Sequence, residues 1–383
     1  MDFSLSSQQT EIQLEARAFA AEKIRPIAAQ IDVERRFPIE LIPELARHGF
    51  LAGTIPVEYG GRGLDYISIA LVYEEIGRAC SSVRGFLAVH VGLVSMCIFD
   101  WGTEEQKRTL LPKLARGELL GCYALTEENA GSDVAAIEST AVESGDGFMI
   151  NGSKVWITNG NIASLMLLFA STDRSLKHKG IAAFIVDPAS DGVQRRRMEN
   201  PELGHRASDH ARIEFNNLRV QRSSILGQPN EGFKIAMTAL DHGRIGVAAG
   251  AVGVGQACLD ACIDFARNRK QFGKPIGDFQ MIQQTIADMA TDIEAARFLV
   301  YRAAFLKSQG KPTRTESSIA KLFATEAAMR AASEAVLLHG SRGYSNAYPV
   351  ERYFRDIKGY QIYEGTSHIQ RIIIARSLLN QNS

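Results

Sequence analysis

A single carboxylate near the C-terminus, that of Glu364, stands between an aromatic residue and a glycine. The surrounding sequence reads YEGTSHIQR over residues 363–371, and an apolar run follows it. Thr366 and Ser367 favour a helix start, and Gly365 permits a bend or a close backbone approach. Beside bulky apolar groups a carboxylate loses solvation, which raises its pKa and makes it a better base near neutral pH. The local residues leave two interpretations open: Glu364 is a catalytic base, or it caps the following helix through the helix dipole.

The composition is that of an ordinary globular protein. The 383 residues are 45% hydrophobic and 22% charged, which suffices for a large core in two or three domains. The 43 basic and 43 acidic side chains cancel, so neither nucleic acid nor a membrane surface is expected as a partner. The short basic cluster at residues 195–197 is interpreted as a solvated strand edge or loop.

Cysteine usage and the N-terminal sequence bear on location. No signal-peptide pattern is present, and no apolar run approaches the ~18 residues that span a bilayer, so a cytoplasmic protein is expected. The cysteines lack the spacing of a metal site, so no metal is predicted and buried thiols in a reducing compartment are expected. The five are Cys80, Cys97, Cys122, Cys258 and Cys262.

Helical periodicity dominates both ends of the chain, and strand patterns lie between them. We predict an N-terminal α-helical domain over residues 1–118, a middle β domain over 119–228 and a C-terminal helical domain over 229–383. Because helices and strands do not alternate, a Rossmann sheet is not expected. The predicted fold class is mainly α with a central β domain.

Three local patterns give sharper structural predictions. Asn151-Gly152 is the strongest short hairpin signal in the chain, and Asn216-Asn217 is predicted to turn the chain. A third pattern is a group of glycines that lies inside a helical pattern without the spacing of a dinucleotide fingerprint, so it predicts close helix packing. These glycines are Gly250, Gly253 and Gly255.

Four further stretches carry a family resemblance when they are read together with the one around Glu364. They are YALTEENAGSD at residues 123–133, KVWITNG at 154–160, DHGR at 241–244 and RKQFGKPI at 269–276. Their order and spacing resemble the acyl-CoA dehydrogenase family along the entire chain. Residues 169–174 and 232–237 are most similar to the short-chain (butyryl-CoA) branch.

The resemblance implies both a fold and an activity. The implied fold has an N-terminal helical domain, a middle β-barrel or sandwich domain and a C-terminal four-helix bundle. The implied activity is FAD-dependent α,β-dehydrogenation of a short acyl-CoA to a trans-2-enoyl-CoA. The family holds FAD noncovalently, usually in a homotetramer, and passes electrons to an electron-transferring flavoprotein.

The resemblance also implies roles for individual residues. Glu364 would abstract the α proton while hydride passes to the flavin. The implied cofactor-binding residues are Tyr123, Leu125, Thr126, Ser132, Trp156, Thr158, Arg269, Phe272, Gln280, Leu337, Gly340, Ser341, Thr366 and His368. The implied substrate-binding residues are Ser132, Asp241, Arg244, Tyr363 and Gly365. Without the resemblance, a core tryptophan, a strand-end threonine and an ion pair on a helix surface are the ordinary interpretations of Trp156, Thr126 and Asp241–Arg244.

Some residues depart from the family pattern. Leu337 stands where a glutamine is usual, and Gly340-Ser341 replaces two glycines. Arg206, His210 and Arg212 form an unusually basic set. Because acidic carrier proteins favour basic docking surfaces, an acyl group tethered to an acyl carrier protein in secondary metabolism is the alternative substrate. A third reading, from a different class, is a flavin-bearing binding protein that does not dehydrogenate.

Overall fold

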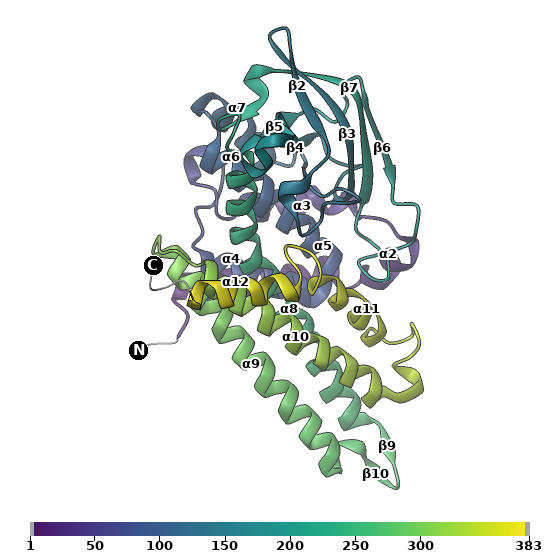
Figure 1. Cartoon of the computed structure of the whole chain (residues 1–383). Helices are drawn as coiled ribbons and strands as arrows, with labels where there is room; N and C mark the ends of the chain where they lie inside the picture. Colours follow the sequence, from purple (N-terminus) through teal and green to yellow (C-terminus); the bar gives the residue numbers. More distant parts are fainter. Residues whose placement is uncertain (1–3, 380–383) are drawn as a thin grey trace.

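The computed structural model describes residues 4–379, with a sheet domain at one end and a helical bundle at the other (Figure 1). The chain begins with a helical domain whose buried apolar residues belong to two clusters, one shared with the C-terminal helices and one shared with the sheet domain. A π-helical segment, Ala88–Ser95, continues α5 into α6. The helices of this domain are α1 (Ser7–Phe19), α2 (Ala28–Glu34), α3 (Ile42–Arg47), α4 (Tyr66–Ala79), α5 (Ser81–Leu87), α6 (Met96–Trp101) and α7 (Glu104–Ala115).

The middle of the chain forms one eight-stranded sheet. Its main path has the order β6-β7-β3-β2-β4-β5-β8, and β1 pairs with β4 in parallel. The basic cluster lies in β6, which pairs only with β7 among the described strands, so the expected solvated strand edge is confirmed. The strands are β1 (Gly121–Ala124), β2 (Thr140–Ser144), β3 (Gly147–Thr158), β4 (Leu165–Ser171), β5 (Ile181–Val186), β6 (Val193–Arg197), β7 (His210–Gln221) and β8 (Ile225–Leu226).

The two predicted turns in this domain are wrong. Asn151-Gly152 lies inside β3 and Asn216-Asn217 lies inside β7, and the register between the two strands shifts there. Asn217 has a φ of 53°, and its backbone N–H donates to the Asn151 side chain at 2.8 Å. Residues that tolerate left-handed backbone serve a bulge as well as a turn, which explains the error.

The C-terminal domain is built on three long helices. They are α8 (Gly232–Asn268), α9 (Gln280–Ser308) and α10 (Arg314–His339). A small hairpin of β9 (Lys270–Gln271) and β10 (Lys274–Pro275) joins α8 to α9 at the tip of the bundle (Figure 1). Two shorter helices, α11 (Val350–Tyr360) and α12 (Ser367–Leu379), follow and end the described chain. The predicted order of helical, sheet and helical domains is therefore confirmed.

The glycines of α8 lie where that helix meets its neighbours. A Cβ added at Gly77 of α4 would lie 3.0 Å from the Cα of Gly250. A Cβ at Gly253 would overlap the backbone carbonyl of Glu74, also on α4. The prediction of close helix packing is thus confirmed, and it brings α4 and α8 together beneath the candidate site.

Two helical segments, Ser81–Trp101 and Gly232–Asn268, are long and apolar enough to cross a membrane by length and composition. The sequence expectation that no run reaches this length was therefore wrong. In both segments 83% of the apolar window is buried within the protein, so both serve as core helices. All five cysteines are free and buried, as expected.

Candidate active site

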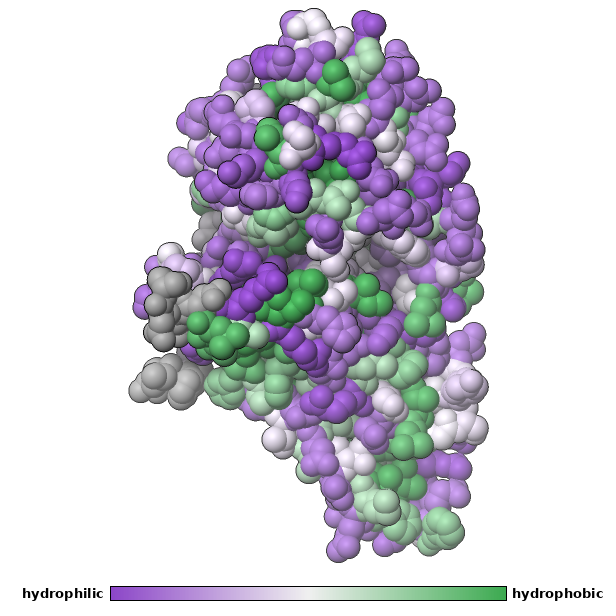
Figure 2. Space-filling model, in the orientation of Figure 1, coloured by the Kyte–Doolittle hydropathy of each residue, from purple (hydrophilic) through white to green (hydrophobic). Residues whose placement is uncertain are grey.

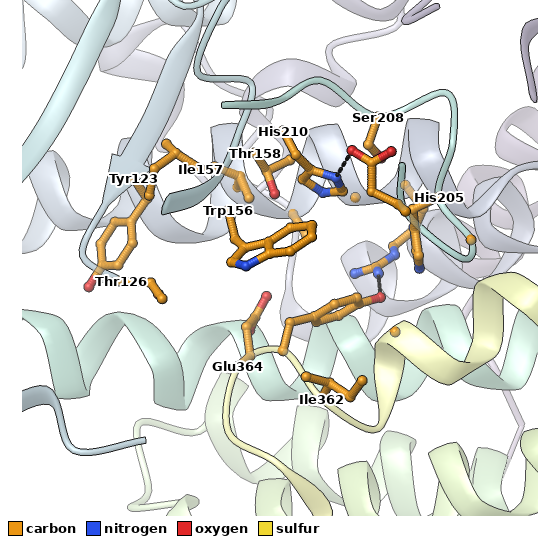
Figure 3. A pocket seen from close by; sticks show the side chains of 18 of the residues that line it. Tyr123, Thr126, Trp156, Ile157, Thr158, His205, Ser208, His210, Ile362 and Glu364 are labelled. Carbon is orange, nitrogen blue, oxygen red and sulfur yellow. Dashed lines mark hydrogen bonds and ion pairs between the residues drawn. The ribbon is translucent and has the colours of Figure 1, made fainter. Parts of the chain in front are cut away.

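A cavity of about 430 Å³ lies where the sheet domain meets the two helical domains. Its walls come from α5 and the π-helical segment, from β1 and β3, from α8, and from the loop between α11 and α12. Figure 3 shows Glu364 in the middle of this cavity, with Tyr123 and Thr126 towards one end and His205 and Ser208 towards the other. We call it the active-site cavity.

Glu364 is held on the loop between α11 and α12. Its φ is 53° and that of Gly365 is 89°, so two successive residues are left-handed and the side chain turns out of the helical path. The Ile369 N–H donates to Thr366 Oγ1 at 3.2 Å, so Thr366 caps α12. Glu364 Oε2 is buried and has no hydrogen-bond partner in the described structure. Helix capping therefore falls to Thr366, and the Glu364 carboxylate faces the cavity without a structural partner.

The α8 backbone passes directly behind this carboxylate. A Cβ at Gly243 would overlap Glu364 Oε2. Gly243 belongs to the DHGR stretch, so this part of the resemblance has a local physical reason. Glycine is required there because any larger residue would push the carboxylate out of its position.

Burial raises the pKa of Glu364 to about 6. Three nearby cations, Arg84, Lys321 and Arg244, oppose that rise and stabilise the ionised form. The balance places the pKa close to neutrality, where a carboxylate is both ionised and basic enough to accept a proton from carbon.

Lys321 of α10 holds the loop that carries Glu364 by hydrogen bonds to its backbone. Its side chain is fully buried, and Nζ donates to the backbone carbonyl of Tyr363 at 3.0 Å and to that of Gly365. These carbonyls flank Glu364 on both sides. Burial lowers the pKa of Lys321 to about 7, against the attraction of Glu364. Lys321 therefore acts as a clamp on the loop as well as a charge beside the carboxylate.

The opposite wall carries the predicted flavin-facing residues. Trp156 has a φ of 58° near the end of β3. The residue is 49% exposed, which is unusual for a tryptophan, and its ring lines the cavity. Thr126 and Thr158 add hydroxyl groups to the same lining, and Tyr123 and Leu125 complete it. Five of the predicted cofactor residues thus come together opposite Glu364 (Figure 3).

Of the five predicted substrate-binding residues, one lines this cavity and four do not. Tyr363 lines it, whereas Gly365, Ser132, Asp241 and Arg244 do not. Arg244 is buried and donates to Asp241. The pair is therefore not the exposed helix-surface pair that local sequence alone suggests.

The remaining predicted cofactor residues do not line this cavity in the single chain. Those at the tip of the bundle are Arg269, Phe272 and Gln280. Those at or after the end of α10 are Leu337, Gly340 and Ser341, and His368 is exposed on α12. Phe272 is 92% exposed and Leu337 72%, so apolar surface is left open there. Figure 2 shows apolar side chains gathered over α12 and along the bundle towards its tip.

Sequence reasoning missed three residues that define the site: Arg84, His205 and Lys321. Arg84 could have been found as an isolated charge in the otherwise apolar stretch of residues 83–98. His205 had no such signal, because it is one of several polar and charged residues in a loop. Lys321 resembles an ordinary solvent-facing lysine in a helical sequence.

Comparison with known proteins gives one consistent result. Family models described as the N-terminal, middle and C-terminal domains of acyl-CoA dehydrogenase match residues 6–118, 122–218 and 230–379. The mitochondrial short-chain specific acyl-CoA dehydrogenase of Mus musculus is 44% identical, covering 95% of this chain and 88% of its own. The short-chain specific enzyme of Clostridium acetobutylicum is 41% identical, covering 98% of this chain and 99% of its own.

The solved structures agree with the sequence comparisons. Butyryl-CoA dehydrogenase from Megasphaera elsdenii superimposes with a TM-score of 0.97 at 39% identity, covering 99% of this chain and all of its own. The order of the helical, sheet and helical domains in this chain agrees with that likeness. The chain is a member of the acyl-CoA dehydrogenase family.

Proposed function

We propose that the protein dehydrogenates a short acyl-CoA to its trans-2-enoyl-CoA, with Glu364 as the base and FAD as the cofactor. The observation that carries this proposal is the Glu364 carboxylate, which lines the same cavity as the open side chain of Trp156 and whose buried Oε2, against Gly243 of α8, has no hydrogen-bond partner. A carboxylate placed in this way has a task outside the protein's own hydrogen-bond network.

The residues present fit a flavin. An aromatic side chain left half exposed in a cavity, with two threonine hydroxyls in the same lining, suits a flat heteroaromatic group with polar edges. When bound, FAD supplies the acceptor for a hydride from the β carbon. We assign its ring to Tyr123, Leu125, Thr126, Trp156 and Thr158.

The protein's own contribution is to position the substrate and to move one proton. Glu364 takes the α proton onto its carboxylate, and the bond between the α and β carbons becomes double as hydride leaves the β carbon. The Glu364 backbone N–H has no acceptor among the described residues, so it is free to donate to the thioester oxygen. Lys321 holds the loop during this transfer, and Gly243 keeps the carboxylate in place.

We assign the rest of the cofactor to a second subunit. The distant residues Arg269, Phe272 and Gln280 would reach a partner's FAD from the tip of the bundle, and the exposed apolar surface there suits burial in a homotetramer. Leu337, Gly340, Ser341 and His368, with Thr366 nearer the loop, would complete that contact. An electron-transferring flavoprotein is the proposed acceptor. A cytoplasmic location is proposed from the free cysteines.

The carrier-protein alternative is not favoured. The reported relatives are named for CoA thioesters. Two of the three residues in the unusual basic set have acidic partners: Arg212 pairs with Glu128 and His210 with Glu202 at 3.4 Å. A non-dehydrogenating binding protein would not need the Glu364 carboxylate facing the cavity.

An anaerobic titration tests the proposal. Butyryl-CoA should bleach the flavin of the wild-type holoprotein, and Glu364→Gln should bind FAD normally but be bleached at least 1,000-fold more slowly. Near-normal bleaching of that variant would show that Glu364 is not the base that takes the α proton. Bleaching by a butyryl-carrier-protein thioester alone would establish the alternative substrate, and bleaching by neither would point to a binding protein.

A further inference from the structure

Gln370 of α12 is a fully buried polar side chain that the proposed reaction does not use. It lies in the first turn of that helix, which begins at Ser367, and its backbone N–H donates to the Thr366 carbonyl at 2.9 Å. The side chains of an α-helix lean towards its N-terminus. Gln370 is therefore directed back at the loop that carries Glu364.

The side-chain amide of Gln370 donates to two backbone carbonyls of that loop. Its Nε2 lies 2.9 Å from the carbonyl oxygen of Gly365 and 3.3 Å from that of Glu364. Lys321 holds the carbonyls of Tyr363 and Gly365, so it leaves out the one between them. Within residues 4–379, Gln370 is the only side chain that donates to the Glu364 carbonyl.

This contact decides how the peptide group between Glu364 and Gly365 is oriented. A peptide group is planar and trans, so its N–H points away from its carbonyl. The two residues that it joins have φ values of 53° and 89°, and glycine adopts positive and negative φ about equally. Steric repulsion alone therefore does not prevent this group from turning over. A hydrogen bond to its carbonyl is what keeps it in one orientation.

The other atom of the Gln370 amide shows what distinguishes this residue from an apolar one. Oε1 is buried and has no hydrogen-bond partner in the described part of the chain. A buried acceptor without a partner destabilises a fold, and a methionine of similar length would not carry that cost. The amide is thus retained in spite of Oε1, and the donors of Nε2 are the groups that the loop uses.

We propose that Gln370 is a positioning residue for the dehydrogenation, which fixes the Glu364–Gly365 peptide group and so keeps the Glu364 carboxylate against Gly243. This role rests on the proposed function. The connection is direct, because the amide holds the backbone of Glu364 itself, whereas no hydrogen bond holds Oε2 of its carboxylate. Without Gln370 the carboxylate would leave its place at Gly243, and the α proton would no longer meet a base at a fixed distance.

Three variants test this role in the FAD-loaded protein. Gln370→Met keeps the length of the side chain without its donors, so it should slow flavin reduction at saturating butyryl-CoA by about 10-fold or more. The butyryl-CoA concentration that gives half of this rate should stay within about 3-fold of wild type. Gln370→Glu keeps the shape but turns an oxygen onto both carbonyls, so it should be slower still. The control is Gln361→Met, which removes an exposed contact with Lys358 and should have the wild-type rate.

The order of the two Gln370 variants separates hydrogen bonding from packing. If the side chain only fills space, Gln370→Glu should be at least as fast as Gln370→Met, and that result would overturn the proposal. A smaller loss of rate in Gln370→Met than expected, or a loss confined to the half-saturating concentration, would also overturn it. If neither variant folds, Gln370→Asn retains an amide that is one methylene too short. It should still slow the reaction by about 5-fold or more, and a wild-type rate would contradict the role.

Unfolding in denaturant tests the position of the carboxylate without any reaction. Burial raises the pKa of Glu364, so Glu364→Gln should stabilise the otherwise wild-type protein at pH 8. If Gln370 holds the carboxylate in its buried position, this stabilisation should fall by at least half when both proteins also carry Gln370→Met. A smaller fall overturns the role of Gln370. If no thioester reduces the wild-type flavin, the proposed function fails, and this comparison still decides whether Gln370 positions Glu364.

Discussion

Replacing Glu364 by glutamine should stabilise the protein above neutral pH, although it abolishes the reaction. The fold raises the pKa of this carboxyl from an ordinary 4.5 to about 6. A shift of that size corresponds to about 2 kcal/mol of unfavourable free energy for the ionised group, at ~1.4 kcal/mol per pKa unit. The neutral amide does not carry this penalty.

The sign follows from proton binding in the two states. Between pH 4.5 and 6 the folded state binds more protons at Glu364 than the unfolded chain, so stability falls as the pH rises through this window. The advantage of Glu364→Gln should therefore be absent below pH 4.5, grow through the window and level off at about 2 kcal/mol above pH 6.

Denaturant unfolding of the holoprotein from pH 4 to pH 8 measures this difference. Glu105→Gln is the matched control, because Glu105 is exposed and the same change there should give a difference that is small at every pH. A Glu364→Gln variant less stable than wild type at pH 8, or a difference that does not vary with pH, would refute the electrostatic account of the site. Flavin bleaching by butyryl-CoA, followed in the same samples, separates lost chemistry from lost folding.

Three other variants examine how the site is held. Gly243→Ala should slow flavin reduction at least 100-fold, because its Cβ overlaps Glu364 Oε2. Gly92→Ala is the control, since its Cβ meets nothing within 4 Å and the rate should stay unchanged. A wild-type rate in Gly243→Ala would show that the carboxylate moves freely. Gly253→Ala should lower the free energy of unfolding by about 3 kcal/mol, because its Cβ overlaps the Glu74 carbonyl and overpacks the helix contact. An unchanged melting temperature would contradict the packing of α4 on α8. Lys321→Met should lower kcat more than it raises KM, and should move the acid limb of the pH–rate profile from near pH 6 to higher pH, because Lys321 lowers the pKa of Glu364. A profile that keeps its wild-type limb would leave Lys321 with a packing role alone.

The sequence was informative wherever one local pattern had one physical meaning. Helical periodicity predicted the helical domains, and the glycines of α8 predicted close packing because a missing Cβ has few other uses inside a helix. The stretch around Glu364 predicted both the turn and the helix cap at Thr366. These features depend on residues that are near one another in the chain.

The errors arose where one residue type serves two geometries or where the partners are distant in sequence. Asn151-Gly152 supports a bulge as readily as a hairpin, and only the opposing strand decides between them. The role of Arg84 depends on Tyr360 and Tyr363, which are more than 270 residues away in the chain. The apolar stretch of residues 83–98 indicates that this charge is buried, but no local pattern could show which groups it contacts or that one of its nitrogens is unpartnered.

The exposed ring of Trp156 also allows flavin binding to be followed by tryptophan fluorescence. The chain has two tryptophans, and the other, Trp101, lies outside the cavity with the Lys234 ammonium 4.7 Å from its ring. Resonance energy transfer to a flavin beside Trp156 would quench its emission far more strongly than that of a more distant indole. In Trp101→Phe the remaining fluorescence would therefore report the fraction of protein molecules that hold flavin, without any added dye.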